Sequence, residues 1–286
     1  MAVELVPAKP EHVAQISRIA YKSFLGISSR HGFPPDFPNA ESAKPVYDLL
    51  IQRDDYIGLV ALINGRPVGS NFVMKSDRIA AIGPLSVDPS VQGHGVGRLL
   101  MTSILALAAV QQLNDVRLLQ DTYNATALAL YSSLGFEVRD TVALMHTSPS
   151  DSRDPFVRPI RSSDFEEIDR ISSTLFNASR RNEVLIESQY GFQTYIRERE
   201  GRATGYLVPG LVGHGVYETE EDALALLTSA SELVTPHFRK FLCPLRQSDL
   251  FQKCLKAGWR IEKLLTYMTL GPYEYPKGIW TPSACY

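Results

Sequence analysis

The pattern of apolar and polar positions predicts an alternating series of strands and helices over the first half of the chain. Apolar residues at helical spacing predict helices that open near residue 10, cover 43–52, run from a glycine-rich stretch to about 112, and cover 124–134. Short branched or alternating apolar stretches predict strands over 3–6, 56–63, 67–75, 78–87, 116–122 and 136–145. The order β-α-α-β-β-β-α-β-α-β predicts a mixed α/β fold with a partly antiparallel central sheet flanked by helices.

Two connections in this half have a distinctive composition. Asn64-Gly65, between two predicted strands, predicts a tight hairpin turn. Residues 26–40 contain His31, Phe33 and Phe37 among prolines, which predicts an irregular, ring-lined loop. Such a loop either lines a ligand site or packs over a core edge, and the sequence leaves both readings open.

The second half of the chain repeats the first. Residues 148–156 are polar and contain proline, as in a linker between domains. Beyond them, five residues follow their counterparts at one constant offset: Pro159, Ile168, Arg170, Ile171 and Phe176 after Pro7, Ile16, Arg18, Ile19 and Phe24. We therefore expect two tandem copies of one domain, over 1–147 and 157–286.

A glycine-rich stretch, residues 92–97 (Gln-Gly-His-Gly-Val-Gly), joins a predicted strand to a predicted helix. The first backbone N–H groups of a helix have no partner within it, and the positive end of the helix dipole lies there. Glycines let an anion approach these groups closely. The Walker pattern is absent because Gly97 is followed by Arg98-Leu99 and not by Lys-Ser/Thr. The dinucleotide pattern Gly-x-Gly-x-x-Gly is absent because Gly93, Gly95 and Gly97 are spaced by two.

Gln-x-x-Gly-x-Gly after a Leu-x-Val-x-Pro strand end resembles the coenzyme A pyrophosphate loop of the GNAT superfamily of N-acetyltransferases. A second motif of that family is visible where Asn124 is followed by Tyr131-Ser-Ser-Leu-Gly-Phe136. The resemblance implies two tandem acetyltransferase-like domains and acetyl-CoA as the acetyl donor. It also implies cofactor contacts from a larger set of residues: Leu85, Ser86, Val87, Gln92, Gly93, His94, Gly95, Val96, Gly97, Arg98 and Asn124.

Direct acetyl transfer to an amine requires a proton acceptor for the amine, hydrogen-bond donors for the thioester oxygen, and an acid for the departing thiolate. Tyr131 is the expected acid, since the resemblance places it near the thioester sulfur. The base stays open among His31, Asp121, the terminal carboxylate of Tyr286 and water. The alternative class is a non-catalytic acyl-CoA-binding sensor or scaffold protein, although such a protein has no need of the acid.

The second copy lacks the glycine loop. Residues 218–222, Glu-Thr-Glu-Glu-Asp, stand where the loop would begin, and Cys254 stands in the place of Tyr131. Carboxylates suit a helix N-terminus but repel a pyrophosphate. The second copy is therefore expected to be degenerate and to shape the acceptor pocket, with a ring-rich tail at 271–286 that either contributes to that pocket or only caps its own domain.

Composition and charge limit the classes of binding partner that we expect. A net charge of −2 gives no reason to expect nucleic acid or an anionic membrane. Three late cysteines and no signal-like start favour a reducing, cytoplasmic location, and six scattered histidines show no metal-ligand spacing, so no metal is expected. The acceptor is expected to be an amine of a small molecule or peptide, acted on by a monomer or a homodimer.

Overall fold

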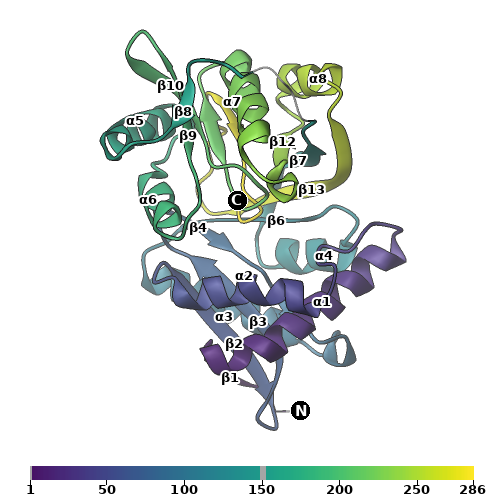
Figure 1. The fold of residues 1–286 in the computed structure, drawn as a ribbon. Helices are drawn as coiled ribbons and strands as arrows, with labels where there is room; N and C mark the ends of the chain where they lie inside the picture. The colour runs from purple at the N-terminus through teal and green to yellow at the C-terminus, as the bar shows by residue number, and fades with distance from the viewer. Residues whose placement is uncertain (1, 149–152) are drawn as a thin grey trace. The chain divides into compact units, whose positions relative to one another are not determined.

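The computed structural model describes residues 2–148 and 153–286, apart from the side chain of His237. These residues form two compact units. The first unit takes its described residues from Met1–Lys75, Ile79–Val116 and Tyr123–Phe136, and the second from Ser76–Arg78, Arg117–Thr122 and Glu137–Tyr286. Figure 1 traces the chain through both units, which are described separately below.

The elements of the first sequence repeat follow the predicted order, except that two strands replace the one predicted over 78–87. In chain order they are β1 (Glu4–Pro7), α1 (Val13–Arg30), α2 (Ala40–Gln52), β2 (Tyr56–Ile63), β3 (Arg66–Met74), β4 (Ile79–Ile82), β5 (Ser86–Val87), α3 (Val96–Val110), β6 (Asp115–Asp121), α4 (Ala125–Ser133) and β7 (Glu137–His146). Short 3-10 turns, η1 (Pro10–His12) and η2 (Pro89–Val91), precede α1 and follow β5. The predicted hairpin is present, with Asn64 at φ 51° and Gly65 at φ 74° between β2 and β3.

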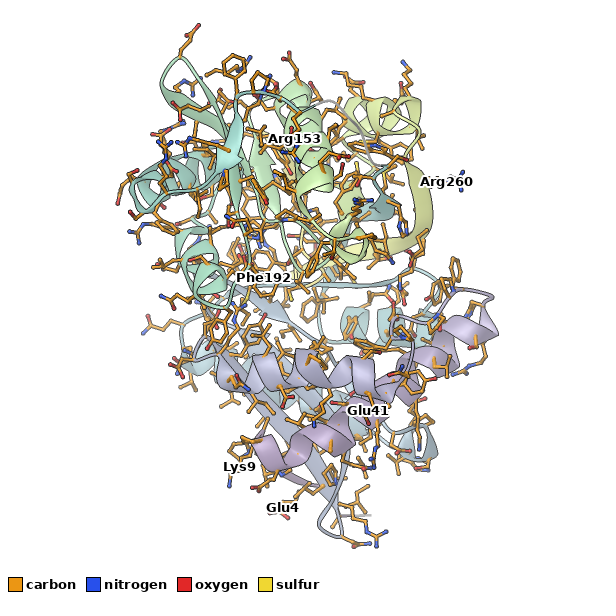
Figure 2. All side chains as sticks on the ribbon, in the orientation of Figure 1. Glu4, Lys9, Glu41, Arg153, Phe192 and Arg260 are labelled. Atoms are coloured by element: carbon orange, nitrogen blue, oxygen red, sulfur yellow. The ribbon has the colours of Figure 1, made fainter. Side chains whose placement is uncertain are left out.

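The first unit is a sheet covered by helices on both faces. Strands β1, β2, β3 and β4 are neighbours in that order, and β5 pairs with β3. Successive residues of β2 point to opposite faces, so Val60 packs against α1 and α2 while Ala61 packs against α3. Figure 1 shows α1 and α2 side by side across β2 and β3. Lys9, before η1, and Glu41, at the start of α2, are exposed and are labelled in Figure 2.

The prediction of an irregular loop over 26–40 is wrong for residues 26–30 and for residue 40, which are helical. Helix α1 continues to Arg30, and Asn39 caps α2 by accepting a hydrogen bond from the Ser42 N–H at 2.9 Å. A single glycine, Gly26, weakens a helix by about 1 kcal/mol without ending it. The irregular segment is therefore the shorter stretch 31–39.

The single strand predicted over 78–87 is also wrong. Strand β4 ends at Ile82, and β5 resumes at Ser86, with Gly83 and Pro84 between them. Proline has no N–H for the ladder, and Gly83 adopts φ 141°, so the strand cannot run through. Strand β3 instead pairs with β4 at Val73 and with β5 at Gly69.

The second repeat has the same element order with one strand fewer, because β11 alone stands where the first repeat has β4 and β5, and this order confirms the tandem arrangement. Its elements are β8 (Val157–Pro159), α5 (Phe165–Leu175), α6 (Arg181–Gln189), β9 (Tyr195–Arg199), β10 (Arg202–Leu207), β11 (Gly215–Tyr217), α7 (Glu220–Leu233), β12 (Lys240–Pro244), α8 (Ser248–Lys256) and β13 (Arg260–Leu270), followed by the tail strand β14 (Ile279–Thr281). Part of the predicted linker, 149–152, lies outside the described residues.

The last strands of the two repeats are exchanged within the second unit. Strand β13 neighbours β6, and β7 lies between β13 and β12. Strand β7 pairs antiparallel with both of its neighbours, and Met145 lies opposite Phe241 of β12 and Ile261 of β13. Each repeat therefore ends in a strand that lies beside the penultimate strand of the other repeat, which is why 137–146 belong to the second unit.

The tail after β13 is ordered in the second unit. Strand β14 pairs with β11, and the backbone N–H groups of Lys277 and Gly278 bond to the Leu175 carbonyl. Trp280 is fully buried and Tyr286 is 1% exposed. Of the two roles considered for the tail, the structure shows the capping of its own unit. Among the described residues, no helix combines the length and apolarity needed to cross a membrane.

Candidate functional site

The glycine-rich loop of the first unit opens the N-terminus of α3. Gly93 and Gly95 have φ of 79° and 86°, a left-handed backbone that side-chain-bearing residues rarely adopt. Gly95 is the N-cap of α3, so this helix start has no capping side chain. A Cβ built at either glycine would meet no atom within 4 Å, so the space above the loop is open.

Several backbone donors face this opening. The first intrahelical bond of α3 runs from the Leu99 N–H to the Gly95 carbonyl at 3.0 Å. Within the described part of the chain, the N–H groups of Val96, Gly97 and Arg98 have no hydrogen-bond partner. Unpaired N–H groups at the positive end of a helix dipole favour an anion, and the open space above the loop leaves room for a group such as a pyrophosphate.

The polar side chains of the loop make hydrogen bonds within the first unit. The Gln92 amide donates to the Val87 carbonyl at 2.9 Å and to Ser23 Oγ at 3.2 Å. His94 is exposed, and its Nδ1 lies 3.0 Å from the Gln92 carbonyl oxygen. Arg98 donates to Ser133 Oγ at 2.8 Å, which connects α3 to α4. Ser23 was not expected from the sequence, because only the fold brings α1 beside this loop.

Strand β5 carries the backbone groups expected beside the cofactor arm. Its pairing with β3 places Ser86 opposite Ser70 and Val87 opposite Gly69, and the Asp88 N–H bonds to Val68. In an antiparallel pair, alternate residues direct their backbone groups to opposite sides. The Val87 carbonyl bonds to Gln92, so the Val87 N–H also points away from β3.

Asn124 and Tyr131 both lie on α4. Asn124 is the N-cap, and its Oδ1 accepts a hydrogen bond from the Ala127 N–H at 3.1 Å. Tyr131 is 9% exposed, with its ring 6.0 Å from that of Phe136. Burial raises the pKa of Tyr131 to about 12, so the phenol keeps its proton at neutral pH.

The loop, strand β5 and helix α4 converge on one point. A Cβ at Gly97 would lie 3.7 Å from both Val87 Cγ2 and Leu130 Cδ2, and Leu130 directly precedes Tyr131. The structure therefore brings the three predicted groups of residues together in the first unit: those of β5, those of the glycine loop and those of α4.

An aromatic stack flanks the start of α4. The ring of Tyr123 lies 4.4 Å from Phe33, nearly parallel at 13°, and 5.1 Å from His31. Tyr123 directly precedes Asn124, so the ring-bearing segment 31–39 packs beside the second motif. Tyr123 was not singled out from the sequence, although its place between a strand and the Asn124 cap was a usable signal.

The three candidate bases have different surroundings. Asp121 forms an ion pair with Lys263 at 2.8 Å. Tyr286 is buried, and its main-chain oxygen accepts a bond from Ser283 N–H at 3.0 Å. His31 is exposed, and its Nδ1 lies 2.9 Å from the Ile27 carbonyl oxygen. A carbonyl only accepts, so Nδ1 carries the proton and Nε2 of the neutral ring presents a lone pair.

The corresponding helix start in the second repeat is closed by side chains. Thr219 caps α7, and Asp222, which is fully buried, accepts hydrogen bonds from the Thr219 N–H and hydroxyl at 3.1 and 2.6 Å. Arg197 donates to the same carboxylate at 2.8 Å. The carboxylate of Asp222 thus takes the position that an anionic ligand needs at a helix N-terminus. Cys254, at the place of Tyr131, is also fully buried.

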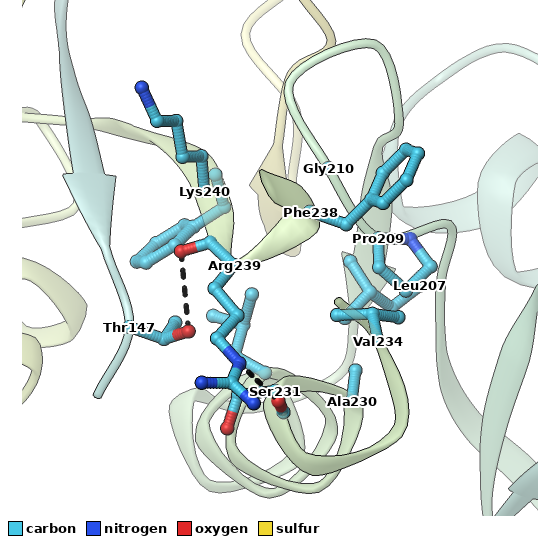
Figure 3. A pocket seen from close by; sticks show the side chains of 12 residues that line it. Thr147, Leu207, Pro209, Gly210, Ala230, Ser231, Val234, Phe238, Arg239 and Lys240 are labelled. Atoms are coloured by element: carbon cyan, nitrogen blue, oxygen red, sulfur yellow. Dashed lines mark hydrogen bonds between the residues drawn. The ribbon is translucent and has the colours of Figure 1, made fainter. Parts of the chain in front are cut away.

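A small hollow in the second unit offers no comparable chemistry. Leu207, Val234 and Phe238 supply apolar walls (Figure 3). Its polar groups bond to one another, since the Arg239 Nε–H donates to the Ser231 carbonyl at 2.8 Å and Thr147 to the Arg239 carbonyl at 3.3 Å. We therefore regard this hollow as a packing feature of α7 and β12.

Comparison with known proteins matches part of the chain to acetyltransferases. Residues 28–136 match the model of the Acetyltransferase (GNAT) family. An uncharacterized N-acetyltransferase of Methanocaldococcus jannaschii is 29% identical over 129 residues, 43% of this chain and 55% of the relative. A mycothiol acetyltransferase of Thermomonospora curvata is 36% identical over 120 residues, 38% of this chain and 35% of the relative. The chain thus spans about half or less of the length of these curated relatives.

Likeness of fold extends further than likeness of sequence. The crystal structure of a candidate acetyltransferase from Pyrococcus horikoshii superposes with a TM-score of 0.76 at 17% identity, over 99% of this chain and 95% of that one. The glycine loop, helix α3 and the segment from Asn124 to Phe136 all lie inside the residues that match the family model. Residues 28–136 thus resemble the GNAT family of acetyltransferases, and the chain as a whole shares the fold of the Pyrococcus horikoshii protein.

Proposed function

We propose that the chain is an N-acetyltransferase that takes an acetyl group from acetyl-CoA and transfers it directly to an amine. The observation that carries this proposal is the open N-terminus of α3. Gly95 leaves the helix start without a cap, and the N–H groups of Val96, Gly97 and Arg98 point to open space. The loop 92–98 would hold the pyrophosphate, and residues 85–87 and Asn124 would hold the pantetheine arm.

Three groups of the first unit would serve the transfer of the acetyl group that acetyl-CoA supplies. The Val87 N–H, directed away from β3, is a donor for the acyl oxygen. Tyr131, whose raised pKa keeps it protonated, is the acid that delivers a proton to the leaving sulfur. His31 Nε2, with its lone pair free to accept, is the base for the amine proton.

The acceptor is a small-molecule or peptide amine. The stack of His31, Phe33 and Tyr123 gives the region beside α4 a flat, ring-lined wall with an exposed imidazole at its edge. Such a wall suits an acceptor with a planar or apolar part next to its amine. The acetyl group is the expected acyl chain.

Thiol release from acetyl-CoA tests the proposal. The full chain is incubated with acetyl-CoA and, separately, with amino acids, polyamines, peptides with a free N-terminus and aminoglycosides. We expect acceptor-dependent release of free thiol with at least one class, and a matching loss of the acceptor amine by mass spectrometry. Binding of coenzyme A without release for any acceptor would favour the sensor or scaffold alternative, and absence of binding would reject both functions.

A further inference from the structure

A cluster of three potential metal ligands lies buried in the second unit. Glu183 and Glu187 are four residues apart on α6, so their carboxylates share one helix face. His214 comes from the segment just before β11. One ligand atom from each of the three lies within 4.8 Å of the others. All three residues are at most 4% exposed.

The His214 ring has no hydrogen-bond partner among the described residues, on either nitrogen. Its Nδ1 lies 3.6 Å from Glu183 Oε1, and its ring makes an edge contact with Tyr206 at 5.5 Å. Burial, followed by the nearby Arg180 charge, lowers the pKa of His214 to about 3, so the ring is neutral. A buried neutral imidazole without partners is unusual, and the ring faces two carboxylates.

Glu183 is held in place by two other side chains. Arg180 donates to both of its oxygens at 2.8 Å, and the Tyr286 hydroxyl donates to Oε2 at 3.1 Å. Oε1, the oxygen nearer to His214, receives only the Arg180 bond among those found in the described residues. Arg180 balances the charge of Glu183, while Glu187 adds a second carboxylate on the side of His214.

We propose that Glu183, Glu187 and His214 bind one divalent transition-metal ion of the zinc type. One imidazole nitrogen and two carboxylate oxygens are a donor set that suits zinc and, less tightly, manganese or cobalt. Arg180 and Tyr286 would orient the Glu183 carboxylate from outside the coordination sphere. The ion joins α6 to the segment before β11, and it stabilises the second unit because only the folded chain assembles the ligands.

The site departs from the absence of a metal expected from the sequence. The sequence analysis singled out none of the three residues, because His214 reaches the two glutamates only through the fold of the chain between β10 and β11. The proposal is independent of the acetyl-transfer function.

Metal analysis of untagged full-length protein tests the site. The protein is stripped with EDTA, incubated with zinc or manganese, desalted, and measured by inductively coupled plasma mass spectrometry. We expect about one zinc ion per chain, and at least a tenfold weaker zinc affinity in competition with a chromophoric chelator for His214→Gln and for Glu187→Gln. His94→Asn removes an exposed imidazole instead and should keep the ion.

Two measurements on the wild-type chain test the site even if the variants do not fold. Zinc should raise the Tm of the stripped wild type, and a zinc-soaked crystal should show its anomalous peak between Glu183, Glu187 and His214. Failure of the wild type to retain zinc, a peak elsewhere, or unchanged affinity in both folded variants would each overturn the proposal and leave a water-filled polar cluster.

Discussion

At the scale of single residues, the first unit differs from the second in what stands at one helix start. Gly95 begins α3 without a side chain, whereas Thr219 and Asp222 close the start of α7. A helix N-terminus attracts one anion, supplied either by the chain or by a ligand. On the proposed function, the residue at that point therefore decides which repeat can take a pyrophosphate.

His94→Asp should weaken coenzyme A binding about tenfold or more relative to His94→Asn. His94 is exposed and is not among the residues with positive φ, so the change adds a negative charge to the loop without the strain of replacing a glycine. A carboxylate a few ångströms from a pyrophosphate costs about 1–4 kcal/mol at the dielectric of a protein surface. Isothermal titration calorimetry measures both variants, and equal affinities would remove the loop from the cofactor site.

Tyr131→Phe should lower kcat about 100-fold or more while leaving coenzyme A affinity nearly unchanged. The variant keeps the buried ring beside Phe136 and removes only the proton that the leaving sulfur needs. Steady-state kinetics with the best acceptor give kcat, and calorimetry supplies the binding control. A kcat within twofold of wild type would show that Tyr131 is a packing residue.

The dependence of the wild-type kcat on pH tests the same role of Tyr131 as the acid. Burial raises the pKa of Tyr131 to about 12, so the acid stays protonated through the usual assay range. We expect no decline of kcat between about pH 8 and 10, where an ordinary tyrosine of pKa about 10 would begin to ionise. A decline with an apparent pKa near 10 that disappears in Tyr131→Phe would contradict the raised value.

At the scale of elements, the sequence predicted those turns and helix ends that depend on residues close together in the chain. The Asn64-Gly65 hairpin, the helix after Gly95 and the stop at Gly135, with φ 93°, follow from residues near each other in sequence. The break between β4 and β5 could be missed because apolar residues continue across Gly83 and Pro84. The contacts of Ser23 and Tyr123 with the motifs, and the cluster of His214, depend on tertiary packing that spacing does not encode.

The capped start of α7 should depend on Asp222 and on pH. Arg197 pairs with Asp222 at 2.8 Å, and also with Asp154 at 2.8 Å and Glu221 at 3.1 Å. Asp222→Asn removes the fully buried one of these three carboxylates and weakens its bonds to the cap, so we expect a loss of about 2–3 kcal/mol in the free energy of unfolding. Glu220→Gln, in the first turn of the same helix, removes a charge paired to Lys253 only at 3.7 Å and should cost under about 1 kcal/mol. Urea unfolding of both variants makes the comparison, and equal losses would contradict the special role of Asp222.

The pH dependence follows from the sign of the shift. Burial alone would raise the pKa of Asp222, but bonds from Thr204, Thr219 and Arg197 outweigh it and the pKa is lowered. A lowered pKa stabilises the fold fully above the unfolded value of about 3.9, and this contribution is lost as pH falls through the folded value. The Tm difference between wild type and Asp222→Asn should be constant from about pH 5 to 8 and shrink below about pH 4.

At the scale of the whole molecule, the two repeats are joined by their exchanged last strands. Repeats along the chain predicted two copies, but the residues of β7 and β13 do not show which partner each strand takes. The boundary at 147 marks the end of the first repeat, whereas the compact units divide within that repeat, before β7. A fragment of residues 1–147 would leave β7 without β12 and β13, so we expect it to aggregate in size-exclusion chromatography, where the full chain does not.

Titration of the full chain with coenzyme A in a calorimeter tests the central claim most directly. The open helix start of the first repeat and the closed one of the second predict a single binding event with one coenzyme A per chain. Two equivalent sites per chain, or no heat of binding at millimolar ligand, would contradict the account.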